Sequence, residues 1–230
     1  VGRRPAPRLL PRLTNPPPAT RHPPPAMSDR IRRIYDRRAA DYDRSVGRAE
    51  GVVLGDFRNR FGALLAGETL EVGIGSGLNL PFYGSAVTST TGIDLSAEML
   101  RVAGDRASAL GRAVVLAQGD AERLPFPDGA FDTVAVSLAL CTVPDPEQAL
   151  REVARVCRPA GTVVLMEHVL SPVAPVAMLQ RLLTPLQERA IGCCLTRRTI
   201  ETARALGFRV ETDAARLLGI VRLVVARPPT

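Results

Sequence analysis

Short apolar runs alternate with helix-like segments over most of the chain, and this alternation restricts the fold more than any other feature of the sequence. The apolar runs predict strands at 69–72, 87–94, 113–117, 131–137, 161–168, 209–212 and 221–226. Between them, apolar residues recur at helical spacing over 78–83, 96–110, 146–156, 175–190 and 198–206. A strand followed by a helix, repeated five times, favours a doubly wound α/β fold with a parallel sheet and helices on both faces.

The chain of 230 residues has room for one sizeable α/β domain, which we expect over residues 27–230. Two amphipathic helices are predicted ahead of the first strand, within 27–66. Residues 1–26 hold nine of the 20 prolines, five arginines and no acidic residue. Such a segment cannot bury a core, so we expect 1–26 to be a disordered, dispensable tail and Met27 to be the start of the folded part.

The net charge of +7 is typical of nucleic-acid binders, but its distribution argues against that class. All 30 basic residues are arginine, and five of them lie in the first 26 residues. The remaining 25 arginines face 23 acidic residues, so the body of the chain is nearly neutral. The sequence contains no run of 18 apolar residues, so no membrane span is predicted. We therefore expect a cytoplasmic protein that binds no nucleic acid.

The cysteines and histidines predict neither a disulfide framework nor a metal site. The four cysteines (Cys141, Cys157, Cys193 and Cys194) form no CxxC pattern, and adjacent cysteines are poorly placed for shared ligation. The two histidines, His22 and His168, are few and far apart in the sequence. Reduced thiols in an intracellular protein are the simplest interpretation.

A glycine-rich turn follows the first predicted strand. Glu71-Val72-Gly73-Ile74-Gly75-Ser76-Gly77 carries glycines at alternate positions and an acid two residues before the first glycine. Glycine lacks a Cβ, so the backbone can turn tightly and a ligand can approach the main chain. The spacing differs from the GxGxxG of dinucleotide-binding folds. A purely structural glycine turn is the alternative interpretation.

Two further acids end the next two strands. Asp94 follows Gly92-Ile93, and Asp120 stands in Gly119-Asp120-Ala121. The first carboxylate can accept hydrogen bonds from a ribose diol, and the second from an adenine amino group. A single acid at a strand end is more often a turn or helix cap, but three in succession are hard to explain in that way.

These residues together resemble the class I S-adenosylmethionine-dependent methyltransferases. Within them, the chain is similar to the ubiquinone/menaquinone C-methyltransferase-like group, which includes bacterial phosphatidylethanolamine N-methyltransferases. The resemblance covers about residues 31–227 and rests on Tyr35-Asp36, Tyr42-Asp43, the 71–77 loop, Asp94-Leu95-Ser96, Gly119-Asp120-Ala121, Leu124-Pro125-Phe126, Phe131-Asp132, Leu150-Arg151-Glu152-Val153 and Arg158-Pro159. Segments 138–143, 166–169 and 192–197 resemble the thiol methyltransferases of animals. Ala160-Gly161 departs from the paired glycines usual before the fifth strand, which affects only a turn.

The resemblance implies a Rossmann-like, mostly parallel seven-stranded sheet and S-adenosyl-L-methionine as cofactor. It implies an N-terminal helical lid at 27–66 and an acceptor-side insertion at 172–197. Its pattern gives cofactor-binding roles to Tyr35, Glu71, Gly73, Gly75, Ser76, Gly77, Asp94, Leu95, Met99, Asp120, Ala121 and Ser137. For Tyr35, packing of an amphipathic helix against the core is an equally good explanation.

Methyl transfer from a sulfonium depends mainly on alignment and desolvation, because the leaving group is already good. A base matters only where the acceptor arrives protonated. His168, at the end of the fifth predicted strand, is our candidate base because its pKa suits proton removal from a thiol, ammonium or phenol. A structural histidine is the alternative.

The acceptor is expected to be a small or lipidic amine, thiol or quinol. The apolar segment 173–190 can line its pocket, contact a membrane surface or simply pack on the sheet. The chain has few aromatic residues, which argues against an aromatic cage that would bind a quaternary ammonium group. A catalytically silent cofactor-binding sensor is the alternative function.

Overall fold

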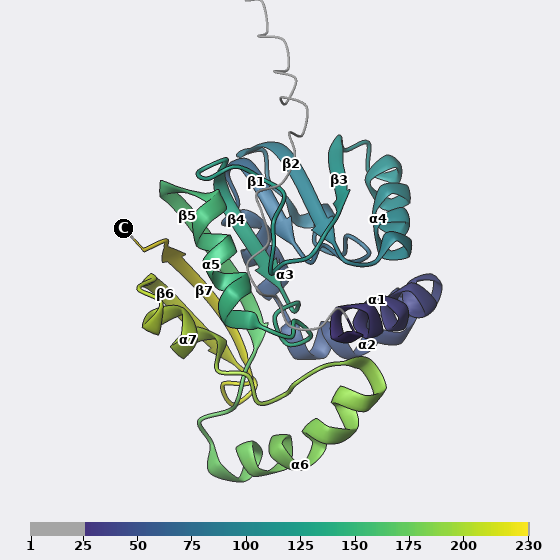
Figure 1. The fold of residues 1–230 in the computed structure, drawn as a ribbon, viewed down its shortest axis with the longest axis vertical. Helices are drawn as coiled ribbons and strands as arrows, with labels where there is room; N and C mark the ends of the chain where they lie inside the picture. The colour runs from purple at the N-terminus through teal and green to yellow at the C-terminus, as the bar shows by residue number, and fades with distance from the viewer. Residues whose placement is uncertain (1–25, 230) are drawn as a thin grey trace, which may run out of the picture.

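The computed structural model describes residues 26–229, so all of the predicted tail except Ala26 lies outside the described residues. Its centre is a seven-stranded sheet in the order β3-β2-β1-β4-β5-β7-β6 (Figure 1). The strands are β1 Gly67–Val72, β2 Val87–Asp94, β3 Val114–Gln118, β4 Phe131–Ser137, β5 Cys157–His168, β6 Arg209–Arg216 and β7 Val221–Arg227. Pairs from β3 to β5 are parallel, and β7 is antiparallel to both neighbours. The predicted mostly parallel α/β sheet is confirmed.

Each face of the sheet has its own apolar core, because successive strand residues point to opposite faces. In β5, Val163 and Leu165 belong to one core, whereas Val164 and Met166 belong to the other. Residues of α5 (Pro146–Val156) and α7 (Thr199–Ala205) complete the first core. Residues of α3 (Phe57–Ala63) and α4 (Ala97–Ala109) complete the second. Helices therefore cover both faces, as the near-continuous apolar strands require.

Two sequence predictions about helices need correction. The helix expected at 78–83 is a single 3-10 turn, η2 (Leu80–Phe82). Pro81 lies in its first turn and has no backbone N–H, and the segment is too short for a stable α-helix. The two helices expected within 27–66 are instead α1 (Ala26–Arg38), the 3-10 turn η1 (Ala39–Asp41), α2 (Tyr42–Leu54) and α3.

The order of the strands creates a switch point between β1 and β4. The chain runs outward from β1 through β2 to β3, then returns to β4 on the other side of β1. Connections on either side of such a point leave in opposite directions, so a crevice opens at the carboxyl ends of the strands. The ends of β1, β2 and β4 are the places where the sequence predicts cofactor-binding residues.

Three helices gather at one end of the sheet, where α6 (Ala174–Ile191) extends away from the body beside α1 and α2 (Figure 1). The C-terminal end of α6 is joined to α1, because Arg30 donates to the carbonyls of Glu188 and Arg189 at 3.0 and 2.8 Å. Gly192, with φ of 74°, ends α6 in the left-handed conformation. Across residues 26–229, no helix is long and apolar enough to cross a membrane.

Candidate active site

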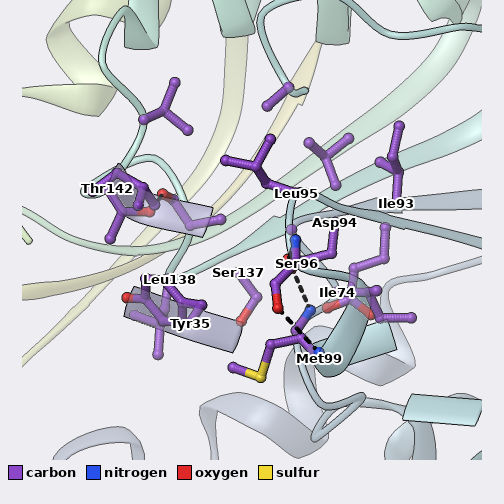
Figure 2. Close-up of a pocket in the computed structure, with 18 of the residues that line it drawn as sticks. Tyr35, Ile74, Ile93, Asp94, Leu95, Ser96, Met99, Ser137, Leu138 and Thr142 are labelled. Atoms are coloured by element: carbon purple, nitrogen blue, oxygen red, sulfur yellow. Dashed lines mark hydrogen bonds between the residues drawn. The ribbon is translucent and has the colours of Figure 1, made fainter. Parts of the chain in front are cut away.

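A cavity lies at the carboxyl ends of β1, β2 and β4, beneath α1. Figure 2 shows side chains from α1 and from the loop after β4 on one side of it, and side chains from the β1 loop, β2 and α4 on the other. The labelled residues that face one another are Tyr35, Leu138 and Thr142 against Ile74, Asp94 and Met99. The cavity therefore combines segments that are far apart in the sequence.

The glycine-rich turn after β1 is left-handed at Gly73, Gly75 and Gly77, with φ of 70°, 56° and 76°. A Cβ on Gly73 would lie 2.4 Å from that of Ala139, and one on Gly77 would lie 2.8 Å from Leu80. On Gly75 its nearest neighbour would be 4.0 Å away. Gly73 and Gly77 thus permit close packing, whereas Gly75 leaves its main chain open to a ligand.

Glu71 ends β1 as a buried carboxyl group with two buried donors. Asn79 donates to Oε1 at 2.5 Å, and the hydroxyl of Tyr83 donates to Oε2. Burial raises the pKa of Glu71 to about 7, and the two hydrogen bonds oppose that rise. Arg58 donates to Asn79 and so supports the arrangement.

Asp94, at the end of β2, holds the glycine-rich turn against the start of α4. Its Oδ2 accepts from the backbone N–H of Gly75 at 2.9 Å, and its Oδ1 accepts from that of Ser96 at 2.9 Å. Burial raises the pKa of Asp94, although backbone donors favour its charged form. Each oxygen keeps a second lone pair, so the carboxylate can still accept bonds from a diol.

The remaining strand ends complete the cavity wall. Asp120 and Ala121 lie beyond β3, and Asp120 Oδ1 accepts from the N–H of Glu122 at 3.0 Å. Leu95 and the buried Met99 line the same side, and Ser137 lines the floor at the end of β4. Apolar contacts beside one carboxylate suit a flat ring that carries an amino group.

The N-terminal helices are attached directly to this wall. Asp36 accepts from the hydroxyl of Ser96 at 2.6 Å, and Asp43 accepts from that of Ser76 at 2.7 Å. Tyr35 lines the cavity between them. Its pKa is raised well above the usual value by burial and then by the nearby Cys141, so its hydroxyl stays protonated. These contacts hold α1 and α2 beside the cavity.

His168 lies behind the wall rather than among the cavity-lining residues. Its Nε2 is 3.1 Å from Cys193 Sγ. Burial lowers the pKa of His168, but the hydrogen bond to Cys193 and the charges of Cys193 and Glu167 outweigh it and raise the value overall. The thiol of Cys141, then His168, lower the pKa of Cys193. The opposite directions of these two pKa shifts favour a proton on the imidazole and a thiolate on Cys193.

Eleven of the twelve predicted cofactor-binding residues line one cavity; the exception is Gly77, which packs beside it. Two pairs of residues were not predicted: Asn79 and Tyr83, which donate to Glu71, and Cys141 and Cys193, which lie beside His168. The first pair had a usable signal, because a buried carboxylate requires donors and these residues follow it closely in the sequence. The thiols had none, since their proximity depends on the course of α6.

Comparison with known proteins agrees with this geometry. Residues 70–165 match a family described as a methyltransferase domain. The chain is 41% identical over 160 residues to a phosphatidylethanolamine N-methyltransferase from Cereibacter sphaeroides, covering 67% of this chain and 76% of that one. It is 32% identical over 143 residues to a ubiquinone/menaquinone biosynthesis C-methyltransferase from Bdellovibrio bacteriovorus, covering 60% and 61%. It is 38% identical over 151 residues to a human thiol S-methyltransferase, covering 62% and 61%.

Solved structures support the fold. The YcgJ protein from Bacillus subtilis superposes with a TM-score of 0.61 at 20% identity, over 76% of this chain and 97% of that one. At that identity the likeness concerns the arrangement of strands and helices alone.

Proposed function

Because the chain belongs to the class I S-adenosylmethionine-dependent methyltransferases, we propose that it methylates a lipidic acceptor that it meets at a membrane surface. The enzyme class and the cofactor follow from the family. That the acceptor is lipidic is our proposal, and the exposed apolar face of α6 beside α1 is the observation that supports it.

The described residues fit S-adenosylmethionine. The Gly75 main chain is open to the cavity, and Asp94 has free lone pairs beside it. Asp120 lines the same cavity as Leu95 and Met99, whose apolar side chains can enclose a ring. The cofactor would supply a methyl group on a sulfonium. Glu71 and its donors hold the β1 end rigid, and Asp94 fixes the glycine-rich turn.

The chain's own contribution to the reaction is alignment and exclusion of water. In-line transfer needs the acceptor atom roughly 3 Å from the methyl carbon and opposite the sulfur. Tyr35, Leu138 and Thr142 form the wall from which an acceptor would approach (Figure 2). They are neutral, and they suit an acceptor that arrives without charge at its reacting atom.

α6 supports a lipid surface as the source of that acceptor. Its exposed large apolar residues recur at helical spacing: Met178, Leu179, Leu182, Leu183 and Leu186. Leu182 is 75% exposed and Met178 68%, and a cluster of exposed apolar side chains of this size marks a contact surface. Arg181 and Arg189 on the same helix would attract anionic headgroups. The helix end contacts α1, so a bound α6 would bring the cavity close to the membrane.

The names of the relatives leave the reacting atom open among amine, thiol and quinol. One relative is named for phosphatidylethanolamine, one for ubiquinone/menaquinone and one for thiols. All three are named as enzymes, which lends no support to a silent sensor. We propose a cytoplasmic, peripherally bound enzyme with no nucleic-acid partner.

The expected role of His168 as a base remains a prediction. Its Nε2 faces Cys193, so a proton from an acceptor would have to pass through that thiolate or follow a rotation of the ring.

A direct test measures methyl transfer with matched acceptors. The purified protein, radiolabelled S-adenosylmethionine and vesicles of anionic phospholipid with ethanolamine lipid or quinol are compared with soluble amines, thiols and short-chain quinols. We expect label in the lipid fraction, and vesicle-bound protein in the same tubes. Efficient methylation of soluble acceptors, with vesicles neither bound nor labelled, would contradict the lipid proposal and leave the enzyme class intact.

A further inference from the structure

Three potential metal ligands meet behind the cavity wall. Cys141 lies in the loop after β4, His168 ends β5, and Cys193 follows Gly192, the residue that caps α6. One ligand atom from each, two Sγ and one imidazole nitrogen, lie within 4.8 Å of one another. Both thiols are buried. Within the described residues this is the one such group that contains thiols or histidine.

The backbone holds these loops together independently of the three side chains. The N–H of Cys194 donates to the carbonyl of Cys141 at 2.9 Å, and the N–H of Leu170 donates to that of Arg197 at 2.9 Å. Arg197 also donates to the carbonyl of Val143 at 2.6 Å. The site is therefore built into the fold, and a bound ion would meet a prepared set of donors.

We propose that Cys141, His168 and Cys193 bind one Zn²⁺ ion through their two Sγ atoms and the imidazole Nε2. Thiolate and imidazole are the ligands that zinc favours, and a tetrahedral site places them roughly 3.6 to 3.8 Å apart. The Nε2 to Sγ distance of 3.1 Å is shorter, and all three ligand atoms lie within 4.8 Å of one another. The Nε2–Sγ edge would lengthen by about half an ångström to accept the ion, and the other edges would adjust by at most about 1 Å.

The surrounding charges and polar atoms agree with a cation at this place. Two thiolates would neutralise the ion, and the neighbouring Glu167 and Arg197 would balance each other. His168 Nδ1 and Glu167 Oε2 are buried without a hydrogen-bond partner among the described residues. Glu167 Oε1 is already fixed by the N–H groups of Ala139 and Leu140, at 2.9 and 3.2 Å. The negative charge of Glu167 acts on His168, which favours a cation beside the imidazole.

The protein supplies three ligands, which leaves a fourth position for water or an added ligand. The adjacent Cys194 is not the fourth, because its Sγ is directed to the hydroxyl of Thr196 at 3.4 Å. Zinc sites with three protein ligands are those that keep an exchangeable position. The charges of Cys141 and Cys193 act on Tyr35, which is part of the acceptor wall. The site therefore lies next to that wall.

Metal content and Co²⁺ absorption test the proposal without measuring activity. The full-length protein is purified under reducing conditions, dialysed against zinc and analysed by elemental mass spectrometry. About one zinc per chain is expected, and Co²⁺ in its place should give the intense visible absorption of a tetrahedral thiolate complex. Cys141→Ser, Cys193→Ser and His168→Gln should each weaken zinc binding by more than about 100-fold.

Cys194→Ser is the matched control, because it removes the neighbouring thiol and should leave zinc binding unchanged. Melting temperature and S-adenosylmethionine affinity establish that each variant is folded. A folded, reduced wild-type protein that takes up no zinc would overturn the proposal. So would equal loss of zinc in the Cys194 variant, or a Cys141–Cys193 disulfide as the stable state under reducing conditions. These results are separate from the lipid assay, which can succeed or fail with the zinc site intact.

Discussion

The two ends of the cavity differ in how their polar groups are satisfied. At the β1–β2 end, the carboxyl groups of Glu71 and Asp94 each accept hydrogen bonds on both oxygens. Behind the other end, which α1 and the loop after β4 form, His168 Nδ1 and Glu167 Oε2 are buried without a partner in the described chain. Five large apolar side chains of α6 are exposed nearby.

Unpaired buried polar atoms and exposed apolar surface both cost free energy, so they are usually compensated by something that binds. The first end is preorganised before any ligand arrives. The second end has unpaired polar atoms and exposed apolar side chains, as expected of a surface that becomes fully paired and covered only when its ligands bind. Substitutions at the first end should therefore act on cofactor affinity, and those at the second on turnover, metal or lipid.

Asp94→Ala should produce the largest loss at the preorganised end. It removes the acceptor for the N–H groups of Gly75 and Ser96 and the predicted acceptor for two ribose hydroxyls. We expect S-adenosylmethionine to bind about 100-fold more weakly, since charge-assisted bonds are lost and partners are left unpaired. Titration calorimetry measures this. An unchanged dissociation constant in the folded variant would show that the ribose lies elsewhere.

His168→Ala should act only at the other end. A base would lower turnover on the order of 100-fold for an acceptor that loses a proton, with cofactor affinity nearly unchanged. The rise of rate with pH near neutrality should vanish with the imidazole. The zinc content of the same variant tests the other proposed role of His168, because removal of a zinc ligand should lead to loss of the metal. Full turnover at full stability would exclude His168 from the chemistry.

The same contrast explains what the sequence could predict. Glu71, Asp94 and Asp120 each stand at the end of a strand, so a local pattern was enough to place them together. Gly77 lies beside the cavity, where an added Cβ would meet Leu80 and Ala103, and a glycine pattern alone does not distinguish such packing from ligand contact. Its cofactor-binding role stays a prediction. Cys141 and Cys193 meet only because α6 returns and bends at Gly192, and no periodicity in the sequence encodes that return.

Glu71→Gln should change the dependence of stability on pH. The pKa of Glu71 is about 7 in the folded protein, above the usual 4.5, so the folded state binds the proton more tightly. Glu71 therefore contributes to the free energy of unfolding at low pH, and this contribution is lost as the pH rises towards 7 and above. The variant should remove about 2 kcal/mol of the decline in unfolding free energy between pH 5 and 8.

Urea unfolding of both proteins at several pH values, without cofactor, checks this prediction. The groups that face Glu71 are Tyr83, Asn79, Arg58 and Asp94, and none of them is altered. Glu98→Gln, an exposed carboxyl in α4, is the matched control and should leave the slope unchanged. If the decline were as steep in the Glu71 variant as in the wild type, the carboxyl would be ionised throughout that range.

The smallest effect is expected on the exposed face of α6. Leu182→Ser replaces the most exposed of its apolar side chains without touching the core. Transfer of a leucine side chain into the interface contributes about 1 kcal/mol when it is partly inserted, so binding to anionic vesicles should weaken about fivefold. Val115→Ser is the control, because Val115 is also exposed but lies on the edge strand β3, at the opposite end of the molecule from α6 (Figure 1). Co-sedimentation with vesicles measures both variants, and activity towards a soluble acceptor should stay at the wild-type level. Equal losses for the two positions would mean that general hydrophobicity, rather than α6, carries the contact, and the two ends of the cavity would then be less distinct than proposed.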